Sequence, residues 1–391
     1  MEMTTKLRHA ELSELAQVLK SQSEVKYDVV AHSNDLRFTD GNLVITGGDQ
    51  ALSIDGVTTI DTTLRPTAVF DEGIADKLNI PIKYLRKMRD DNQPGLLDHN
   101  VNTWLDANQT NWFVRGFKEA GSDEPGIGRA FLSDQYRVID NYDALLAVLD
   151  GIRQTGTEID VVGCDLSERR MSVKIAAPGI SALAPILLGQ YRSPFDDATP
   201  ERAEALARHG WLRDDEAPVV FAGFEASNSE TGGGAWVLKP RLIIKRCRNG
   251  LTVKLDQIRH VHLGSKMDQG IVRWSDETQK KNVELITAQT ADAVKTFLDV
   301  DYIKAKLAEV EKVADHKVAK PVEVISKVSS ALKFTKEEAD GILDCFIKSG
   351  DTTAGGVMQA ITAQAQLVVD PDRASVLEDA ALEALSMAAS S

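Results

Sequence analysis

The chain has 391 residues, 43% of them hydrophobic, and a formal net charge of −14 at pH 7. That apolar fraction can build a core, which excludes a wholly disordered chain, and at roughly 100–200 residues per domain the length fits two or three structural units. Nowhere does the sequence contain the apolar run of about 18 residues that a membrane span requires. We therefore expect a soluble protein with no membrane partner.

The sequence holds three cysteines, Cys164, Cys247 and Cys345, at wide spacing. An odd, sparse set without a CxxC pair argues against a disulfide framework and against a structural zinc site. Residues 1–20 are charged and amphipathic, and they lack the continuous apolar core of a signal peptide. These features predict free thiols in a reducing compartment and a protein that stays in the cytoplasm.

The first part of the sequence predicts a surface helix, then strands, then two helices. Residues 4–20 have an amphipathic pattern, and alternation predicts strands at 25–30 and on both sides of Asp40-Gly41, which is a hairpin turn signal. The segment 64–88 has a helical pattern after Pro66. Pro81 opens its second helix, because proline is tolerated in the first helical turn.

Two strands around a loop of glycine, proline and aspartate at 121–128 are expected next, followed by an apolar helix. Either Asn141 or Asp143 would supply the side-chain oxygen that caps this helix. Strands at 158–162 and 171–176 then pair across a short turn.

Beyond residue 178 the predicted elements become irregular and then helical. Residues 178–218 are rich in proline, aspartate and arginine and predict an irregular insertion with one short helix; strand patterns return within 219–247. Helical periodicity predicts one long helix at 278–313. Shorter helices follow, Thr335 opening one of them with a capping box, and residues 370–391 predict a helix that frays into a Ser/Ala tail.

Together these patterns predict an α+β fold, with a mainly antiparallel, strand-rich body followed by a helical C-terminal part. The expected domains are an N-terminal surface helix at 1–24, the body at 25–277 and the helical region at 278–391.

The sequence lacks the common catalytic and nucleotide-binding motifs, namely GxxxxGK[ST], GxSxG, HExxH and GxGxxG. No Lys-Ser or Lys-Thr follows Gly232-Gly233-Gly234, so this run predicts a hairpin tip. Acid pairs such as Asp196-Asp197 fit solvated loops better than a Mg²⁺ site. We therefore expect no enzyme activity, no cofactor and no small-molecule substrate.

His260 and His262 are two residues apart, a spacing that puts both rings on one face of a strand. Such a pair can begin a metal site, but no spacing demands any of the candidate third ligands, Cys247, Glu230 or Asp256. Phosphate or base contacts and a plain polar face are the alternatives, and we expect no bound metal.

Cations gather between residues 239 and 273. This stretch holds nine lysines and arginines against two acids, a charge of +7, which leaves −21 for the rest of the chain. Clustered cations are what counterion release from a phosphate backbone requires, whereas ordinary surfaces mix the two signs. The alternative is that they neutralise acids across a domain or subunit interface. The predicted nucleic-acid-binding residues are Lys239, Arg241, Lys245, Arg246, Arg248, Asn249, Lys254, Arg259, His260, His262 and Lys266.

Aromatic and polar residues occur near these cations. The aromatic residues are Phe221, Phe224, Trp236 and Trp274. Aromatic rings beside cations can stack on unpaired bases, although rings in alternating strands are more often buried in the core. Asn249-Gly250 favours a type I′ turn that sets Arg246 and Arg248 on one strand face. We expect the cations of this turn and Arg259 to lie in one partly exposed surface with a polar loop, formed by Ser227, Asn228, Ser229 and Glu230, and with Arg129 and Arg137.

Three segments carry a family resemblance: Arg129–Asn141, Phe224–Gly234, and Arg246–Gly250 followed by Arg259–Gly264. In this order they resemble the phage/plasmid-like domain-of-unknown-function family found in bacteriophages, prophages and conjugative plasmids. The resemblance covers residues 25–300 and departs at Val261-His262, where a small residue or glycine is expected. It implies a mobile-element protein in a bacterial cytoplasm and brings no established activity.

Two functions follow from these observations. The first is nucleic-acid binding, with single-stranded DNA favoured, in phage recombination or replication by a homo-oligomer. The second is a non-enzymatic protein-interaction module, such as an inhibitor of a host defence enzyme whose acidic surface imitates nucleic acid. A third, a metal-dependent nuclease, would need several acids converging near Glu230.

Overall fold

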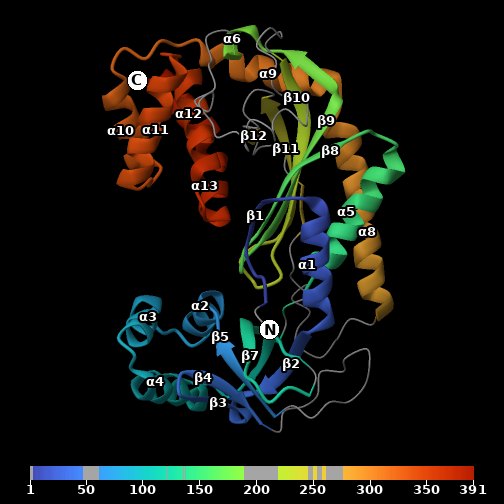
Figure 1. Cartoon of the computed structure of the whole chain (residues 1–391), viewed down its shortest axis with the longest axis vertical. Helices are drawn as coiled ribbons and strands as arrows, with labels where there is room; N and C mark the ends of the chain where they lie inside the picture. The colour runs from blue at the N-terminus through green and yellow to red at the C-terminus, as the bar shows by residue number, and fades with distance from the viewer. Residues whose placement is uncertain are drawn as a thin grey trace.

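The chain folds into two β-sheets with helices around them, as the computed structural model shows (Figure 1). The structure describes residues 3–46, 61–119, 121–134, 136, 138–188, 219–244, 250–252, 258–260 and 276–391. Within these ranges, no helix has both the length and the apolar character needed to cross a membrane.

Sheet B has six strands in the order β2-β6-β7-β5-β4-β3. They are β2 (Lys26–His32), β3 (Leu36–Thr39), β4 (Asn42–Ile45), β5 (Thr62–Pro66), β6 (Asn111–Phe117) and β7 (Gly126–Ser133). The pair β5–β7 is parallel, and the other described pairs of this sheet are antiparallel. A short 3-10 helix, η1 (Ser33–Asp35), joins β2 to β3.

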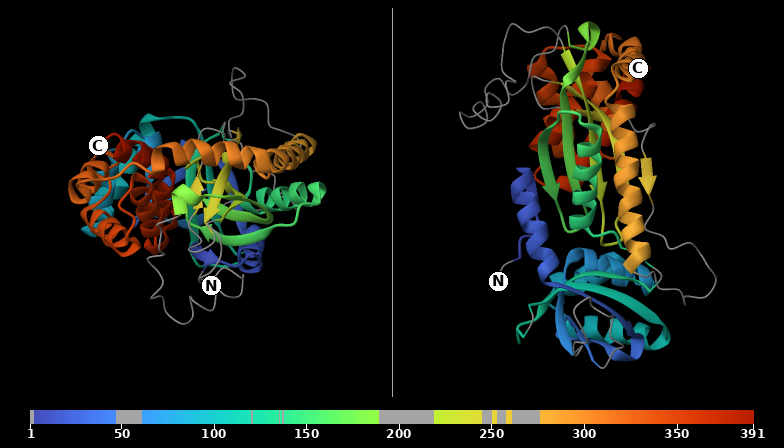
Figure 2. Two further views of the ribbon diagram at one scale, coloured as in Figure 1. Left: turned by 90° about the horizontal axis from the view of Figure 1, so that it is seen from above. Right: turned by 90° about the vertical axis from the view of Figure 1, so that its right-hand side faces the viewer.

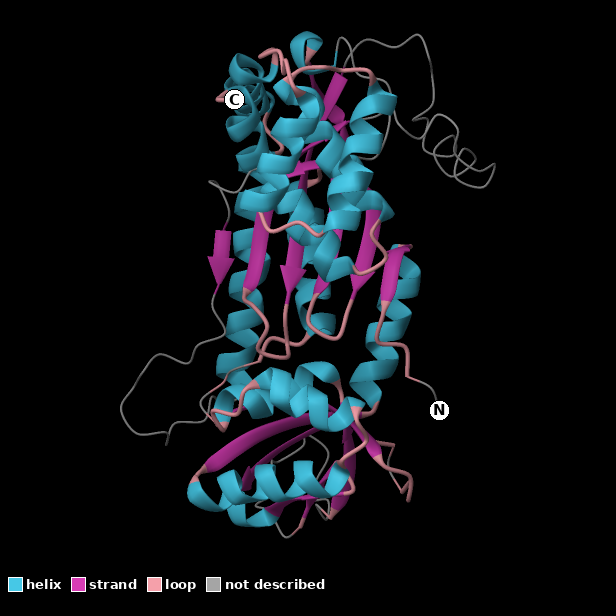
Figure 3. Ribbon diagram, turned by 90° about the vertical axis from the view of Figure 1, so that its left-hand side faces the viewer, coloured by secondary structure: helices cyan, strands magenta, loops and turns pink. Residues whose placement is uncertain are grey.

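Three helices lie in the described residues of this part of the molecule, which we call the sheet B unit (residues 26–133). They are α2 (Ala68–Lys77), α3 (Ile82–Asp90) and α4 (Pro94–Ala107). Their apolar faces and the sheet enclose one hydrophobic core around Leu43, Leu64, Phe70 and Phe131. Figure 3 shows this unit at one end of the molecule.

Sheet A has seven strands in the order β1-β8-β9-β10-β11-β12, with β13 also paired to β11. They are β1 (Leu7–Ala10), β8 (Asp160–Leu166), β9 (Met171–Leu183), β10 (Val219–Asn228), β11 (Trp236–Ile244), β12 (Gly250–Thr252) and β13 (Ile258–His260). All of these pairings are antiparallel.

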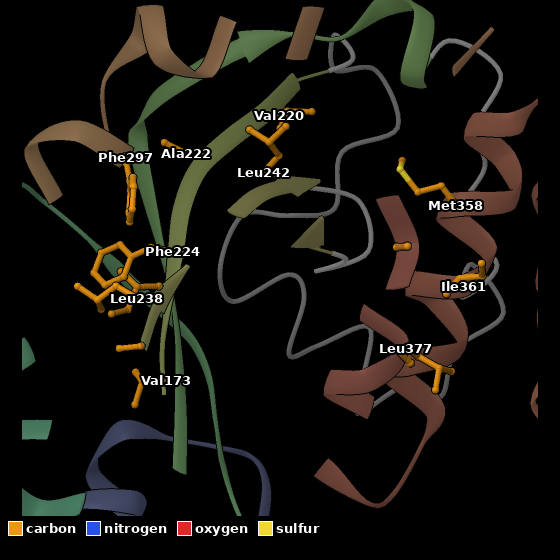
Figure 4. Packing of buried hydrophobic residues seen from close by; sticks show 14 of the residues in the cluster. Val173, Val220, Ala222, Phe224, Leu238, Leu242, Phe297, Met358, Ile361 and Leu377 are labelled. Atoms are coloured by element: carbon orange, nitrogen blue, oxygen red, sulfur yellow. The ribbon is translucent and has the colours of Figure 1, made fainter. Parts of the chain in front are cut away.

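Helices lie on both sides of sheet A (Figures 1 and 2). On one side are α1 (Leu12–Glu24), α5 (Asn141–Thr155) and α8 (Asp276–Phe297), and on the other α12 (Ala354–Leu367) and α13 (Pro371–Ala389). Figure 4 shows Phe224 and Leu238 of the sheet beside Phe297 of α8, while Leu377 and Ile361 belong to the C-terminal helices. The other helices within the described residues are α6 (Pro185–Leu188), α9 (Val300–Ala314), α10 (Pro321–Ala331) and α11 (Lys336–Ser349).

The predicted α+β fold is confirmed: two mostly antiparallel sheets precede a run of helices. Asp40 and Gly41 both have positive φ, 50° and 73°, as a type I′ hairpin turn requires. Thr335 opens α11 with a capping box, as predicted.

Some details differ from the sequence prediction. The helix predicted at 278–313 is two helices, because α8 ends at Phe297 and Asp299 caps α9 by accepting a hydrogen bond from the backbone N–H of Tyr302. The last helix does not fray early, since α13 continues to Ala389 and buries Leu385. The short helix predicted within 178–218 lies outside the described residues.

The N-terminal segment belongs to the core of sheet A. β1 pairs with β8, and α1 buries Leu15 and Leu19 in the same hydrophobic cluster as α5. The chain therefore starts sheet A, builds the whole sheet B unit, and then returns to sheet A at β8.

Candidate nucleic-acid interface

Sheet A has an edge at which the predicted basic stretch begins. β12 and β13 both pair with β11. β12 pairs with the second half of β11, and β13 pairs with its first half, where His260 lies opposite Trp236. Both pairings are antiparallel, so the chain after β11 returns along one side of that strand. The backbone of Arg259 is fixed opposite Val237, which lies opposite Ser227 of β10. One strand therefore separates the backbone positions of Arg259 and Ser227.

Most of the predicted binding residues lie outside the described part of the chain, and their placement stays a prediction. They are Lys245, Arg246, Arg248, Asn249, Lys254, His262 and Lys266, together with Arg137. For Arg259 and His260 the structure gives the strand positions alone. The cations of this stretch that lie outside the described residues belong to three segments. In the sequence, 245–249 follows β11, 253–257 follows β12 and 261–275 follows β13.

Lys239 and Arg241 on β11 are buried and ion-paired, which corrects the prediction that both belong to an exposed cationic surface. Arg241 is 2% exposed, and its guanidinium donates to Glu225 at 2.7 Å and to Glu378 of α13 at 2.9 Å. The Nζ atom of Lys239 lies 3.0 Å from Oδ2 of Asp379. A buried cation is tolerated where a carboxylate pairs with it, so these two charges connect β11 to α13.

Two of the three aromatic residues of β10 and β11 are not free to stack on bases. Phe224 and Trp236 are fully buried in the core of sheet A. Phe221 packs beside Ala176 and Ile243 on the other face of the sheet. Trp274 lies outside the described residues. Phe224 and Trp236 are therefore core residues, as alternating strands favour.

The turn between β10 and β11 is a buried polar hub, which corrects the prediction of a partly exposed polar loop. Residues 227–231 are each no more than 6% exposed. The Nδ2 atom of Asn228 donates to Oδ1 of Asn141 at 2.9 Å. The carbonyl oxygen of Ser229 accepts a hydrogen bond from the hydroxyl of Tyr136 at 3.3 Å. The hub thus joins sheet A to the segment between β7 and α5.

Glu230 is the acidic centre of this hub. Its Oε2 atom accepts a hydrogen bond of 2.8 Å from the backbone N–H of Asn141, and its Oε1 atom pairs with the guanidinium of Arg129 on β7. A carboxylate here satisfies an N–H group at the start of α5 and complements the positive end of the helix dipole. The prediction that Asn141 or Asp143 supplies the capping oxygen is wrong, because Glu230 supplies it from another part of the chain.

Arg115 on β6 is fully buried and links sheet B to the hub. Its guanidinium donates to both carboxylate oxygens of Asp28 on β2, to Asp140 at 2.6 Å and to the carbonyl oxygen of Glu230 at 2.8 Å. The Nζ atom of Lys26 pairs with the same Asp140 at 2.7 Å. Cations and carboxylates thus compensate one another where the two sheets meet.

Charge pairing controls protonation in the hub. Burial by itself would raise the pKa of Asp140, but the charges of Arg115 and Lys26 outweigh it and hold this pKa well below its usual range. Burial, and then the charge of Arg115, lower the pKa of Arg129 to about 9. Arg129 also stacks on Phe117, 4.1 Å from the ring centroid. With that pKa, Arg129 keeps its charge at neutral pH.

Two small cavities lie beside the hub, and Gln22, Arg129, Asn141 and Glu230 line both of them. Each has a volume of about 20 Å³, which has room for roughly one water molecule. Pockets that bury an organic ligand are of the order of 300–1,000 Å³. The hub therefore has the character of a structural junction.

Among the described residues, no group of three or more His, Cys, Asp or Glu side chains is arranged to hold a metal ion. Several of the ligands considered above, Cys247, Asp256 and His262, lie outside those residues. Glu230 is engaged by Arg129.

Sequence reasoning missed Arg115 as a functional residue of the junction. A usable signal is its position within Trp112–Phe117, an otherwise apolar strand, because a cation between buried apolar residues needs a carboxylate partner. The signal does not identify the partners, since Asp140 and Asp28 lie 25 and 87 positions away.

No family model, no curated protein and no solved structure matches this chain. The resemblance to the phage/plasmid-like family therefore stays a prediction. Two of the segments that carry it, Arg129–Asn141 and Phe224–Gly234, meet in the hub around Glu230.

Proposed function

We propose that the protein binds nucleic acid, preferentially single-stranded DNA, through the cations that follow β11 at the edge of sheet A. This activity would serve recombination or replication of a mobile element in a bacterial cytoplasm, and it needs no catalytic residue. With Lys239 and Arg241 set aside, the cations between 245 and 273 are Lys245, Arg246, Arg248, Lys254, Arg259, Lys266 and Arg273. Asp256 and Asp268 are the acids among them.

The observation that carries this proposal is the return of the chain to β11 in both β12 and β13. β11 has nine residues, so its edge is about 30 Å long at roughly 3.3 Å per residue. Cations in the three segments that follow β11, β12 and β13 can contact several phosphates of one nucleic-acid strand. Counterion release then favours binding that depends little on base sequence.

The acidic remainder of the chain repels the same polymer. Binding is therefore expected to weaken steeply as salt rises, and to strengthen when several cationic edges act together in a homo-oligomer. The preference for single strands draws on the resemblance to mobile-element proteins, since the burial of Phe224 and Trp236 removes two of the stacking candidates.

The test measures affinity for single-stranded DNA, duplex DNA and single-stranded RNA from about 50 to 300 mM salt. Five phosphate contacts predict a slope of log K against log salt of about −3.5 on single-stranded DNA, at about −0.7 per contact. The double substitution Arg246→Ala with Arg248→Ala removes two contacts and makes the slope shallower by about 1.4.

A matched control removes two exposed cations from α3 in the sheet B unit, Lys83→Ala with Lys87→Ala. This variant should keep the wild-type slope. Absence of binding at the lowest salt, or a slope that does not respond to the loss of both arginines, contradicts the proposal. The protein-interaction module would then be the better account.

A further inference from the structure

Helix α13 divides its charges between two neighbours. Its acids Glu378 and Asp379 pair with cations of sheet A, and Asp372 lies near the turn between β8 and β9. Arg373 instead pairs with Glu338 of α11, within the C-terminal helices. The helix therefore presents carboxylates to the sheet and its basic side chain to its own bundle.

The sheet offers α13 a row of charges from neighbouring strands. Lys174 of β9, Glu225 of β10 and Lys239 of β11 lie directly opposite one another in register. The Nζ atom of Lys174 lies 2.9 Å from Oε1 of Glu378, and Nη1 of Arg241 lies 2.9 Å from Oε2 of the same carboxylate. Because side chains alternate along a strand, these charges share the face opposite the apolar one that packs on α8.

Without α13, this face carries more cations than acids. Among the residues in these ion pairs, the sheet contributes the cations Arg8, Lys174, Lys239 and Arg241 and the acids Asp165 and Glu225. Arg169 and Arg170 approach Asp372 at 3.9 and 4.0 Å. Arg169 also pairs with Glu72 of α2, so Arg170 is the one of the two that adds to the cationic face. An uncovered face would therefore attract a polyanion.

Ion pairs join α13 to β9 and β11, beside buried apolar side chains of the helix such as Leu377 and Leu385. Taking charges out of water costs about as much as their attraction returns, and Glu378 and Arg241 are only 1% and 2% exposed. Interfaces between domains of one chain resemble transient protein–protein interfaces, which are more polar than obligate ones. Phosphates accept the same charge-assisted hydrogen bonds from lysine and arginine as carboxylates do. A polyanion can therefore replace the carboxylates of α13.

The position of α13 links this face to the cationic edge. The helix packs against β12, one of the two strands that line the edge after β11. From Asp372 to Asp379 the helix rises by about 10 Å, at about 1.5 Å per residue. That length is close to the length of about three nucleotides, at about 3.4 Å per nucleotide along one strand of a duplex.

We propose that the charged face of sheet A under α13 is a second binding surface for single-stranded nucleic acid, which α13 covers until the nucleic acid displaces it. This inference rests on the proposed function and adds regulation to it. The carboxylates of α13 compete with phosphates for Lys174, Lys239 and Arg241, so the C-terminal helices act as an autoinhibitory cover.

The test compares full-length variants for binding to single-stranded oligodeoxythymidylate at one low salt concentration. The main variant is Asp372→Asn with Asp379→Asn, because these carboxylates are 24% and 23% exposed and their loss leaves Glu378 in its buried pairs. We expect its affinity to rise about five- to tenfold, because a larger fraction of the protein then has the face uncovered.

The matched control removes two exposed acids of the C-terminal helices that lie outside these ion pairs, Asp340→Asn with Glu383→Gln. This control removes the same number of negative charges as the main variant, and it should change the affinity by less than about twofold. If the wild type binds and the main variant binds no tighter than this control, α13 is a permanent cover: the inference fails while the proposed function stands. If no variant binds at the lowest salt, the proposed function fails and the inference with it.

A second measurement keeps the wild-type ion pairs of α13. The hydroxyl of Ser375 on α13 accepts a hydrogen bond from Arg170 at 3.2 Å. In a Ser375→Cys variant, the reaction of the introduced thiol with a maleimide is followed by mass spectrometry, with and without oligodeoxythymidylate. Displacement of α13 predicts a faster reaction when the oligonucleotide is bound. An unchanged or slower reaction in a variant that binds the oligonucleotide overturns the inference.

Discussion

Glu230 accepts a hydrogen bond of 2.8 Å from the backbone N–H of Asn141 and so caps a helix that begins 89 positions earlier in the chain. The same carboxylate pairs with Arg129 on β7. One side chain thus connects the turn of sheet A, the start of α5 and a strand of sheet B. The stability of the junction between the two sheets should depend strongly on it.

Removing this carboxylate should destabilise the protein. In Glu230→Ala, the buried cation of Arg129 loses its partner and α5 loses its cap, which together should lower the free energy of unfolding by about 3–5 kcal/mol. Urea denaturation followed by circular dichroism measures the loss. The exposed Glu158→Gln should stay within about 0.5 kcal/mol of the wild type. A loss below about 1 kcal/mol in Glu230→Ala would show that the junction does not depend on this pair.

Acid should weaken the junction through Asp140. Its pKa is lowered in the folded protein, because Arg115 and Lys26 outweigh the effect of burial. A carboxyl with a lowered folded pKa stabilises the protein above its unfolded pKa of about 4 and loses that contribution as the pH falls below it. Unfolding free energies measured by urea titration from pH 7 down to pH 3 should therefore decrease.

The comparison with Asp140→Asn isolates this group from other carboxyls. The pKa of Asp71 and that of Asp143 are raised, mainly by burial, so these groups contribute in the opposite direction. The difference in unfolding free energy between wild type and Asp140→Asn should be largest near neutral pH and shrink towards pH 3. A difference that is independent of pH would exclude Asp140 as a source of the acid sensitivity.

Arg241 should behave as a structural cation. Arg241→Met removes the cation that pairs with Glu225 and one of the two that pair with Glu378, Lys174 being the other. It should lower the free energy of unfolding by about 3–5 kcal/mol. While the variant is folded and α13 covers the charged face, the slope of log K against log salt should change by less than about 0.7, the value of one phosphate contact on a single strand. Urea denaturation and the salt titration measure the two effects. A slope shallower by a full contact would show that a phosphate reaches Arg241, as displacement of α13 predicts.

The packing of α5 on α8 should not tolerate a larger residue at Gly151. A Cβ atom there would lie 2.6 Å from the carbonyl oxygen of Thr287 and 2.7 Å from Cβ of Thr290. Gly151→Ala should therefore lower the free energy of unfolding by about 1–3 kcal/mol, because the two helices must separate.

Gly95 in α4 supplies the matched control, since a Cβ atom at this helical glycine meets nothing within 4 Å. Gly95→Ala should raise stability by about 0.4–1 kcal/mol through the lower entropy of the unfolded chain. Thermal and urea unfolding of both variants measure the contrast. Equal effects at the two glycines would contradict the packing argument for Gly151.

Features set by neighbouring residues could be predicted from the sequence. The turn at Asp40-Gly41 and the capping box at Thr335 depend on side chains within a few positions of one another. The α+β class likewise follows from the period of the apolar pattern, which local sequence fixes. In such features, residues close together in the sequence determine the local backbone geometry, so the rest of the chain need not be known.

The candidate site was harder to predict, because a charge pattern does not say what covers it. Lys239 and Arg241 have the same sequence character as the cations after them, yet carboxylates of α13 bury both. Lys174 and its partner Glu378 are 204 positions apart. Sequence periodicity indicates which side chains favour burial. A buried charge also needs an oppositely charged partner, and that partner comes from a distant part of the chain, which periodicity does not reveal.

The excursion of the chain through the sheet B unit has a consequence for folding during synthesis. β1 is made first, but its partner β8 follows the whole of residues 26–133, with Leu7 ending opposite Leu166. The ribosome therefore delivers the six described strands of sheet B before β8 can pair with β1. Units whose contacts are complete early form early, while long loops between partners delay pairing. The nascent chain should thus carry a finished sheet B unit while the edge strand β1 still waits for β8.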